Sequence, residues 1–505
     1  MQTPSSVLQI STRRVATLGL ALMALMPLST GQTKEWLKEQ QSFLDNSEEA
    51  PVYTGARACA VNGGPLAVEL LLVLLSLESS RGLPAPHYRD IAWDSLVKVK
   101  TDEGRAVVAM FLEDSDSEMV REWCADLLGL YGDDQFGEVL VDALRDRDDA
   151  VKRATARALG RLKYEPAVKG LLKLRKSKDP RTRGNAIGSL AQIKLEDHRE
   201  LFLSAIEKDK DPSVQCALLS MVPALLPERC EALSVTAVGH EDWRPALQGV
   251  RNLGDIATKT SVDALVVAAT AARSRISLEA VDMLTRLTDL KYSRADQWAS
   301  WWKDNRATFE FPKKRGKRRK REEDKSAATY NGVRVDSSNV AFLMDVSSWM
   351  DRELEKRQEK RIDVARDEMA QAFEAIKPPF TFNVFLYAED IEALSPKKPL
   401  ELSKRNNKKA LAFVEDARAY GRKDIWNALF TTITDGRYDT IYLLSSGEPD
   451  VGWVVHTEHL NYHLAELIRF HPVVVHSIAY TDKDGHQAQL DRIAETTGGD
   501  SRHVE

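Results

Sequence analysis

The chain is poor in the residues that mark redox, zinc and membrane proteins. Its 505 residues contain four cysteines, and no two of them form a CxxC pair. This scatter excludes a cysteine-based zinc motif. The cysteines lie among small or apolar residues, so we expect buried free thiols, although an oxidising compartment would permit a disulfide between Cys216 and Cys230. The four are Cys59, Cys124, Cys216 and Cys230.

Signatures of enzymes are also missing. No glycine-rich loop matches a phosphate cradle, and the runs around Ser347 and Ser446 lack the nucleophile-elbow pattern. His459 and His463 stand four residues apart on a predicted helix, a spacing at which two imidazoles can share a zinc ion. No acidic residue completes an HExxH motif, so we expect this pair on an exposed polar helix face. The sequence therefore predicts no enzyme and no catalytic residue.

Long apolar runs are absent apart from one near the N-terminus. Arg13 and Arg14 precede VATLGLALMALMPL, which is too short to span a bilayer comfortably and is followed by small residues. We therefore predict a signal peptide over residues 1–31, cleaved near Gln32. The Ser-Thr-Arg-Arg sequence is also compatible with twin-arginine export, although the residues after it match poorly. The expected location is outside the cytoplasm, in the periplasm, the cell envelope or the medium, with no other transmembrane helix.

A regular period runs through the first part of the chain. Four successive segments repeat with steps of 31, 31 and 32 residues, and a fixed period of this size indicates stacked helical hairpins. Asp or Asp-Pro before the first helix of a unit would supply an N-cap oxygen. We predict helical repeats over residues 98–311, preceded by an N-terminal helical segment over residues 32–97. The equivalent positions are Val120, Val151, Thr182 and Val214.

This stretch resembles the HEAT repeat family in its period, in an Asp-x-x-Val-Arg/Lys start and in a closing Leu-Gly-x-Leu. The resemblance implies an all-α solenoid whose concave side binds other proteins in such families. A rigid spacer without a ligand is the alternative. Trp298, Trp301 and Trp302 lie on one helical face after the last repeat, and we expect them to seal its core.

Charge is nearly balanced over the chain, with a formal net charge of -5, so any charge argument is local. The exception is residues 313–321, KKRGKRRKR, of which eight of nine are basic. Like charges repel and cannot bury, so residues 312–330 are predicted to be an extended basic linker. A solvated hinge is one interpretation, and contact with an anionic surface is the other. No aromatic residues interleave with the basic ones, so we expect no specific nucleic-acid recognition.

From residue 331 to 505, short β-rich runs alternate with amphipathic helices. Such alternation predicts a mostly parallel sheet with helices on both faces. The segments AFLMDVSSWM, TFNVFLYA, GRKDIWNAL and DTIYLLSSGEPDVG follow one another in the order found in von Willebrand factor A domains, which this region resembles. The resemblance implies an α/β doubly wound, Rossmann-like fold that binds ligands at the carboxyl ends of its strands.

In that family a divalent cation is held by an Asp-x-Ser-x-Ser motif, a Thr and a distal Asp. Asp345 and Ser347 match the first two positions, whereas Trp349, Lys423 and Ser446 replace the second Ser, the Thr and the distal Asp. Indole offers no oxygen ligand, and a lysine ammonium repels a cation. We expect a metal-free pseudo-site in which Lys423 pairs with Asp345, and no cofactor.

Two alternatives to the pseudo-site stay open. A rearranged and weaker site could hold Mg²⁺ or Mn²⁺ through Asp345, Ser347, Ser348, Asp424 or Glu448. A shift of the alignment by one residue would instead place Asp424 in the Thr position.

These features together predict an exported, non-enzymatic protein–protein interaction protein, with a helical-repeat scaffold, a basic linker and an A-like domain. Its protein partners are not named by the sequence. A divalent-metal-dependent adhesion or ligand-binding receptor is the alternative. A third hypothesis is an accessory subunit of an extracellular enzyme, or a lipid-associated envelope protein, recruited through residues 313–321.

Overall fold

The computed structural model describes residues 33–78, 85–272, 274–292, 294–312, 328–481 and 484–504. The predicted signal peptide (1–31) and the basic cluster (313–321) lie outside these residues. The chain divides into two compact units, residues 1–198 and 199–505. Among the described residues, no helix combines the length and the hydropathy that a bilayer crossing would require.

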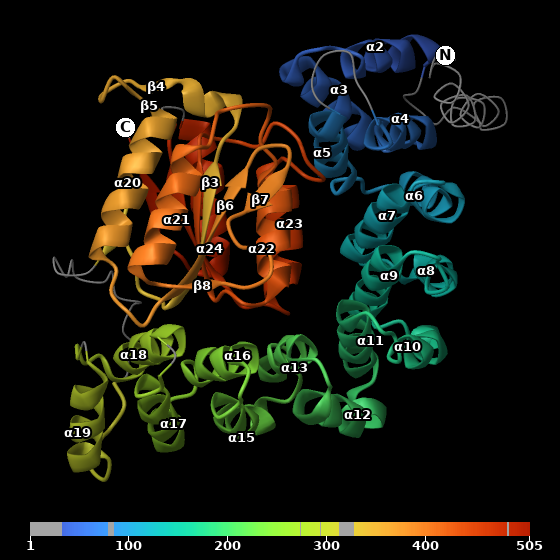
Figure 1. The fold of residues 1–505 in the computed structure, drawn as a ribbon. Coiled ribbons are helices and arrows are strands. Elements are labelled where there is room, and N and C mark those ends of the chain that lie inside the picture. Colours follow the sequence, from blue (N-terminus) through green and yellow to red (C-terminus); the bar gives the residue numbers. More distant parts are fainter. Residues whose placement is uncertain are drawn as a thin grey trace. The chain divides into compact units, whose positions relative to one another are not determined.

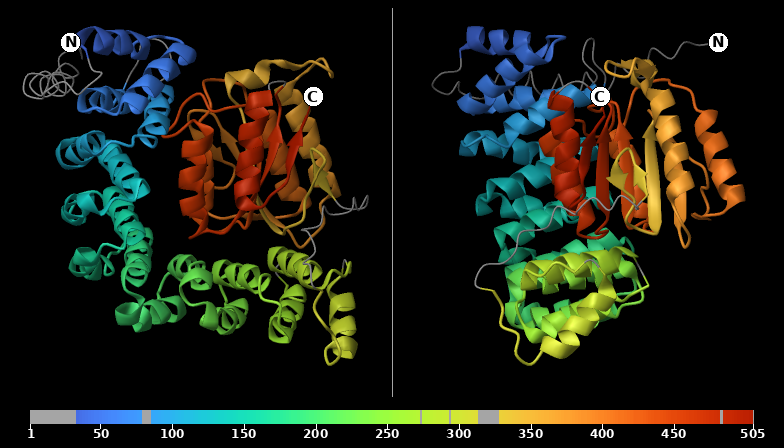
Figure 2. Two further views of the ribbon diagram at one scale, coloured as in Figure 1. Left: turned by 180° about the vertical axis from the view of Figure 1, so that it is seen from behind. Right: turned by 90° about the vertical axis from the view of Figure 1, so that its left-hand side faces the viewer.

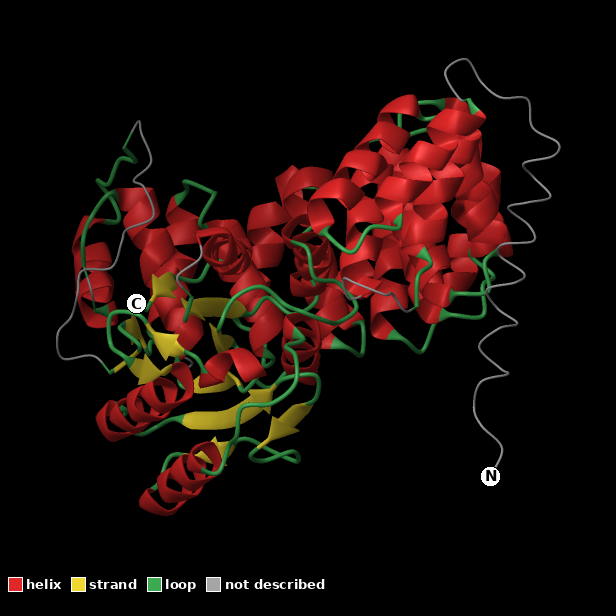
Figure 3. Cartoon of the chain, turned by 90° about the horizontal axis from the view of Figure 1, so that it is seen from above, coloured by secondary structure: helices red, strands yellow, loops and turns green. Residues whose placement is uncertain are grey.

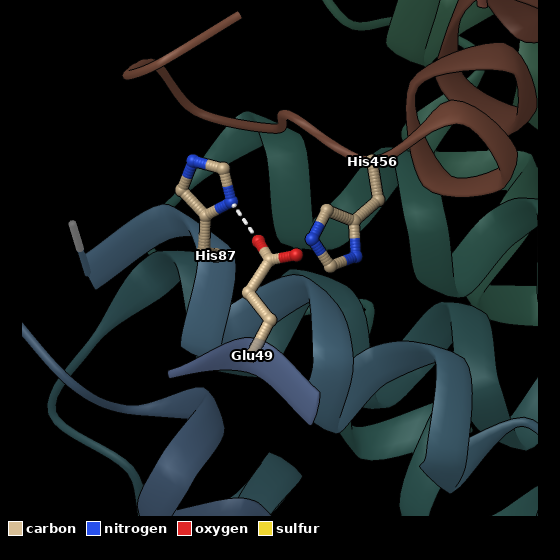
Figure 4. A group of neighbouring side chains, drawn as sticks. All are labelled: Glu49, His87 and His456. Carbon is tan, nitrogen blue, oxygen red and sulfur yellow. Dashed lines mark hydrogen bonds and ion pairs between the residues drawn. The ribbon is translucent and has the colours of Figure 1, made fainter. Parts of the chain in front are cut away.

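The described part of the first unit is helical, as Figure 1 shows. The apolar helix α4 (Pro65–Leu75) has Pro65 in its first turn and is buried along nearly its whole length. A hydrogen bond ties α5 (Ala85–Leu96) to the start of α3 (Glu49–Asn62), because His87 Nδ1 lies 2.7 Å from Glu49 Oε1 (Figure 4). The other elements are α2 (Lys34–Leu44), α6 (Asp102–Asp114), α7 (Glu118–Tyr131), η1 (Asp134–Phe136), α8 (Gly137–Ala143), α9 (Asp149–Leu162), η2 (Glu165–Ala167), α10 (Val168–Leu174) and α11 (Pro180–Ile193).

The second unit contains more helical repeats and then an α/β domain. The boundary between the units falls inside α12 (Leu195–Lys208). The helices that follow in the repeats are α13 (Pro212–Leu219), α14 (Val222–Leu225), α15 (Pro227–Val238), α16 (Trp243–Leu253), α17 (Lys259–Ala269), α18 (Ser274–Thr288) and α19 (Ala295–Asn305).

The predicted Asp N-caps are confirmed in three of the four repeats, whereas Ser117 caps α7, the first helix of the first repeat. The carboxylates of Asp148, Asp179 and Asp211 each accept a backbone N–H from the first turn of α9, α11 and α13 respectively. Each cap satisfies a donor that the helix itself leaves without a partner. The charged turns between hairpins therefore start each repeat.

The residue that follows the repeated Val or Thr, an Arg in two of the repeats, has a structural role. Arg121 and Arg183 each donate a hydrogen bond of 2.8 Å to a carbonyl six residues earlier, at Ser115 and Ser177. Gln215, at the equivalent position, donates to the carbonyl of Asp209 at 2.7 Å. Each of these long side chains fastens the first helix of its repeat to the turn before it.

The glycine of the closing Leu-Gly marks a close approach of neighbouring helices. A Cβ atom at Gly129 would lie 2.7 Å from the Cα of Ala158, and one at Gly160 would lie 2.5 Å from the Oγ of Ser189. Helices α7, α9 and α11 can pack this closely only where a side chain is missing.

The aromatic residues after the last repeat close its core, as predicted. Trp298 and Trp302 are buried in the cluster that covers α16, α17 and α18, and Trp301 packs against its rim. The indole N–H of Trp302 donates to Asp263 Oδ1 at 2.7 Å, so its polar atom is satisfied. All four cysteines of the chain are buried free thiols, which confirms that expectation and excludes the Cys216–Cys230 disulfide.

The α/β domain is built on a seven-stranded sheet in which strands β11, β10, β9, β3 and β6 are parallel and β7 and β8 pair antiparallel with β6. Two short hairpins, β1–β2 and β4–β5, stand apart from it. The strands are β1 (Thr329–Tyr330), β2 (Val333–Arg334), β3 (Asn339–Asp345), β4 (Glu353–Leu354), β5 (Glu359–Lys360), β6 (Thr381–Tyr387), β7 (Ile391–Ala393), β8 (Leu400–Glu401), β9 (Thr440–Ser445), β10 (Val474–Ala479) and β11 (Ser501–His503).

Helices cover both faces of this sheet, as predicted (Figure 2 and Figure 3). On one face Phe342 and Tyr442 stack and pack with α20 and α21, while α22, α23 and α24 lie on the other. The elements are η3 (Ser348–Asp351), α20 (Arg361–Ala375), α21 (Lys404–Glu415), α22 (Ile425–Asp435), α23 (Thr457–Ile468) and α24 (Asp484–Thr497).

Within the second unit, the repeats contact the α/β domain near the amino ends of its strands. Trp243 of α16 donates its indole N–H to the carbonyl of Gly436 at 3.0 Å, and Ser274 of α18 accepts the backbone N–H of Ser338 at 2.6 Å. Arg275 of α18, 2% exposed, binds Asp336 and Thr440. We call these hydrogen bonds the docking contact. They leave the opposite, carboxyl ends of the strands to form the candidate site.

Candidate functional site

Asp345 is the last residue of β3, so its side chain lies at the carboxyl end of the sheet. It is fully buried and its two oxygens are both bonded to protein donors. Oδ1 accepts the backbone N–H of Ser347 at 2.7 Å, and Oδ2 accepts the N–H and the hydroxyl of Ser446 at 2.8 and 2.6 Å. Three donors to a carboxylate stabilise its charge without an ion.

The two consecutive serines after Asp345, of which only Ser347 matches the family motif, have different partners. Ser347 Oγ lies 3.5 Å from Ser446 Oγ, beside the carboxylate of Asp345. Ser348 is exposed and donates its hydroxyl to the carbonyl of Gly421 at 2.6 Å. The structure thus brings Ser347 and Ser446 to Asp345 and turns Ser348 toward the loop before α22.

Lys423 is buried, with 2% of its side chain exposed, and its ammonium lies 3.1 Å from Asp450 Oδ2. The expected pair between Lys423 and Asp345 was wrong, because the ammonium is paired with Asp450 and Asp345 is bonded to Ser347 and Ser446. Lys423 Nζ also lies 5.1 Å from the ring centre of Trp349, over which Arg352 stacks at 3.8 Å. The replaced second Ser position is therefore filled by an indole between cationic groups.

Asp424, the alternative ligand, serves as the N-cap of α22. Its Oδ1 accepts the backbone N–H of Asn427 at 2.8 Å. The loop after β9 closes on it so tightly that a Cβ at Gly452 would lie 2.4 Å from the same oxygen. Burial raises the pKa of Asp424 to about 6.

These residues do not fit an octahedral oxygen site in this arrangement. A hard cation such as Mg²⁺ needs oxygen lone pairs that converge on it. The buried ammonium of Lys423 lies among the same loops, where it would repel a cation, and Trp349 supplies no oxygen ligand. Ser348 is turned to the carbonyl of Gly421, and Asp424 caps α22.

The histidine pair on α23 was predicted on an exposed face, and that prediction was wrong. His459 and His463 are both buried, with their Nε2 atoms 3.0 Å apart, and Trp453 lies 4.3 Å from His463 between ring centres. Their spacing from the buried Leu460 and Leu464 places them on the apolar stripe of the helix, a signal that the polar character of histidine concealed. Within the described residues of this unit, no group of three His, Cys, Asp or Glu side chains converges there.

Asp450 and Arg275 were missed by sequence reasoning. Asp450 follows the predicted strand TIYLLSS in a loop, and only the loop geometry shows that it reaches Lys423. Arg275 occupies the first turn of a repeat helix, and its partners are 61 and 165 residues away in the sequence. No local pattern connects such positions.

Comparisons with known proteins support the repeats. Residues 137–222 match the family of HEAT repeats. The predicted repeats are therefore confirmed over this range. No sequence among curated proteins matches the chain.

Several solved structures resemble parts of the chain at low TM-scores. A von Willebrand factor type A protein from Catenulispora acidiphila is 16% identical over 34% of this chain and 40% of its own, with a TM-score of 0.28, so the match spans less than half of that protein. The complex of CpcE and CpcF of phycocyanin lyase from Nostoc is 17% identical over 55% of this chain and 98% of its own, with a TM-score of 0.27. A Kap121p mutant is 13% identical over 54% of this chain and 35% of its own, with a TM-score of 0.33.

Proposed function

We propose that this is an exported, non-enzymatic protein–protein interaction protein, in which helical repeats carry a von Willebrand factor A-like domain that works without a metal ion. The observation that carries this proposal is the state of Asp345. Its buried carboxylate receives three protein hydrogen bonds, including two from Ser446. In the family resembled, the position of Ser446 holds an acidic metal ligand.

Protein contacts join the three loops that a metal ion would otherwise bridge. The bonds from Ser446 connect the loop after β9 to the end of β3. The ion pair of Lys423 with Asp450 connects the loop before α22 to the loop after β9. A fixed ammonium thus supplies positive charge at this end of the sheet, and a partner would bind here without an ion as intermediary.

The surface at this end of the sheet suits protein recognition. Trp349 is half-buried, and Arg352, Tyr420 and Arg422 are exposed beside it. Aromatic and arginine side chains are enriched at the cores of protein interfaces. We therefore assign the partner surface to these four residues. The helices of the repeats provide the second surface, apart from the side of α16 and α18 that the docking contact uses.

Export and the anionic contact rest on sequence alone. The predicted signal peptide over residues 1–31 and the basic cluster 313–321 carry them. N-terminal sequencing of the mature protein from the producing cells tests export, and a start near Gln32 is the expected result. Co-sedimentation with anionic vesicles at low and high salt tests the cluster.

The metal question is tested by thermal melts of the full chain with excess Mg²⁺, Mn²⁺ or EDTA. A native site at 100 times its Kd would add about 2.7 kcal/mol to the free energy of unfolding. We expect an unchanged midpoint. A rise that EDTA reverses would favour the alternative receptor, with a rearranged site formed from Asp345, Ser347, Ser348, Asp424 or Glu448.

A triple variant tests whether Trp349, Lys423 and Ser446 occupy the family's metal-ligand positions. Trp349→Ser, Lys423→Thr and Ser446→Asp together restore the family's ligand types at positions around Asp345. We expect this triple variant, once circular dichroism shows that it is folded, to be stabilised by Mg²⁺. A folded variant without any Mg²⁺ response would contradict the alignment.

A further inference from the structure

A concentration of positive charge lies on the α/β domain, away from the candidate site. Six basic residues and a single acidic residue, Glu401, occur between residues 395 and 410. The six basic side chains are exposed, and so is Lys377 in the loop between α20 and β6. We call these seven residues the basic patch: Lys377, Lys397, Lys398, Lys404, Arg405, Lys408 and Lys409.

The fold brings the two parts of the basic patch together. The backbone N–H of Leu402, just before α21, donates to the carbonyl of Phe380 at 2.8 Å, so the start of α21 lies near the loop that carries Lys377. Asn407 of α21 donates its side-chain N–H to the carbonyl of Phe373 at 3.2 Å and holds α21 beside α20 (Figure 1). The patch is therefore one surface of the folded domain.

The protein does not neutralise this charge. Elsewhere on the same domain an exposed cation such as Lys360 pairs with a carboxylate, at 2.7 Å from Asp351. None of the seven side chains of the basic patch forms an ion pair with a residue that the structure describes. Lys409 donates only to a backbone carbonyl, that of Leu394, at 3.4 Å. The full charge of the patch faces the solvent.

The basic patch also works against the stability of α21. Lys404 and Arg405 occupy the first turn, which contains no acidic residue. The helix dipole places partial positive charge at this end, so cations are unfavourable there. Lys404 and Lys408 are four residues apart, as are Arg405 and Lys409, and like charges repel at this spacing. Residues that oppose the local structure are typical of functional surfaces, and an anionic partner would offset both costs.

An apolar pocket lies next to these charges. It has a volume of about 360 Å³ and is lined in part by Pro378, Pro379, Phe380 and Leu402. This volume is near the lower limit for small-molecule sites, so the pocket suits a short apolar group better than a whole ligand. Cations beside an apolar hollow fit an amphiphile with an anionic head.

We propose that the basic patch binds the surface of an anionic lipid bilayer, with lipid phosphates at its ammonium groups and an apolar part of a lipid in the pocket. Six of its seven cations are lysines, whose compact charge binds phosphate without demanding a fixed geometry. This contact is separate from the surface around Trp349 and from the basic cluster 313–321.

Co-sedimentation of the full chain with vesicles tests the proposal. We expect binding to vesicles of phosphatidylcholine with phosphatidylglycerol, loss of this binding at high salt, and no binding to phosphatidylcholine alone. Each basic residue near an anionic surface contributes about fivefold to affinity. The variant with Lys404→Gln, Arg405→Gln and Lys408→Gln should therefore bind roughly one hundredfold more weakly.

A control variant makes the same change in net charge at scattered positions. Arg294→Gln, Arg306→Gln and Arg492→Gln remove three exposed guanidinium groups outside the patch, and this variant should bind like the wild type. Both variants are also measured in a full chain whose basic residues at 313–321 are replaced by glutamine. Equal binding by the two variants in that background would overturn the proposal.

Thermal melts separate a binding role from a structural one. The patch variant removes unfavourable charges from α21, so its melting temperature should equal or exceed that of the wild type. A lower melting temperature would contradict the argument from α21. Retention of the wild type on heparin without binding to anionic vesicles would also overturn the proposal, in favour of a soluble polyanion.

Discussion

Replacing Arg275 by methionine should destabilise the second unit strongly. Met keeps much of the side-chain length but removes the charge and the hydrogen bonds, and Asp336, with 1% of its side chain exposed, loses its ion pair with Arg275. Breaking a buried ion pair by removing one member costs roughly 3–5 kcal/mol of stability. The loss of the bonds to Thr440 acts in the same direction.

The matched control lies on the same helix. Arg286 pairs with Asp255 at 2.8 Å, but their side chains are 35% and 59% exposed. An exposed pair contributes about 0–1 kcal/mol, so Arg286→Met should have little effect. Urea unfolding of both full-length variants, followed by circular dichroism and by hydrogen exchange of β9, measures the difference. A loss for Arg275→Met that is no larger than for Arg286→Met would refute the role given to this pair.

Three further predictions concern other parts of the chain. Lys423→Met should lower the free energy of unfolding by about 2 kcal/mol in urea melts, less than a fully buried pair would cost, because Asp450 keeps partial access to water. Glu122 has its pKa raised to about 7 by burial, so its protonation stabilises the first unit at low pH and this contribution is lost as the pH rises through about 7. Glu122→Gln should therefore flatten the stability profile between pH 5 and 8 in thermal melts. Gly129→Ala should cost about 1–3 kcal/mol in urea melts, because the new Cβ would lie 2.7 Å from Ala158.

Controls for these predictions use sites of the same residue type. Lys360, whose pair with Asp351 is exposed, matches Lys423, and Lys360→Met should leave stability nearly unchanged. Gly239, where a Cβ would meet its nearest atom at 3.6 Å, matches Gly129. If Gly239→Ala proved as harmful as Gly129→Ala, close helix packing would not be the cause.

The repeats could be predicted from sequence because their determinants are local. Asp148, Asp179 and Asp211 cap helices that begin immediately after them, and the apolar face of each hairpin repeats within a few residues. The alternation of strands and helices after residue 331 likewise predicts an α/β sheet. Patterns of this kind depend on neighbours in the sequence, so a single chain suffices to detect them.

The candidate site was predicted only in part, because its contacts depend on how loops approach each other. The sequence correctly placed Asp345 at a strand end, but Lys423 pairs with Asp450, 27 residues away, rather than with Asp345. The choice follows from the donors that Ser446 supplies to Asp345, which no spacing rule reveals. His459 was placed on the surface because its residue type outweighed its position on the apolar stripe.

The docking contact also limits how this gene could be rearranged by recombination. A transplanted cassette that began after the repeats would carry Asp336 and Asp439 without Arg275, and both carboxyl groups would lose a guanidinium that faces them. The α/β domain would also lose the hydrogen bonds of the docking contact and expose to water the surface that α16 and α18 contact, so it would be less stable alone. The last repeats and the α/β domain are therefore expected to be inherited together, because α16 and α18 contact the α/β domain and help to stabilise it.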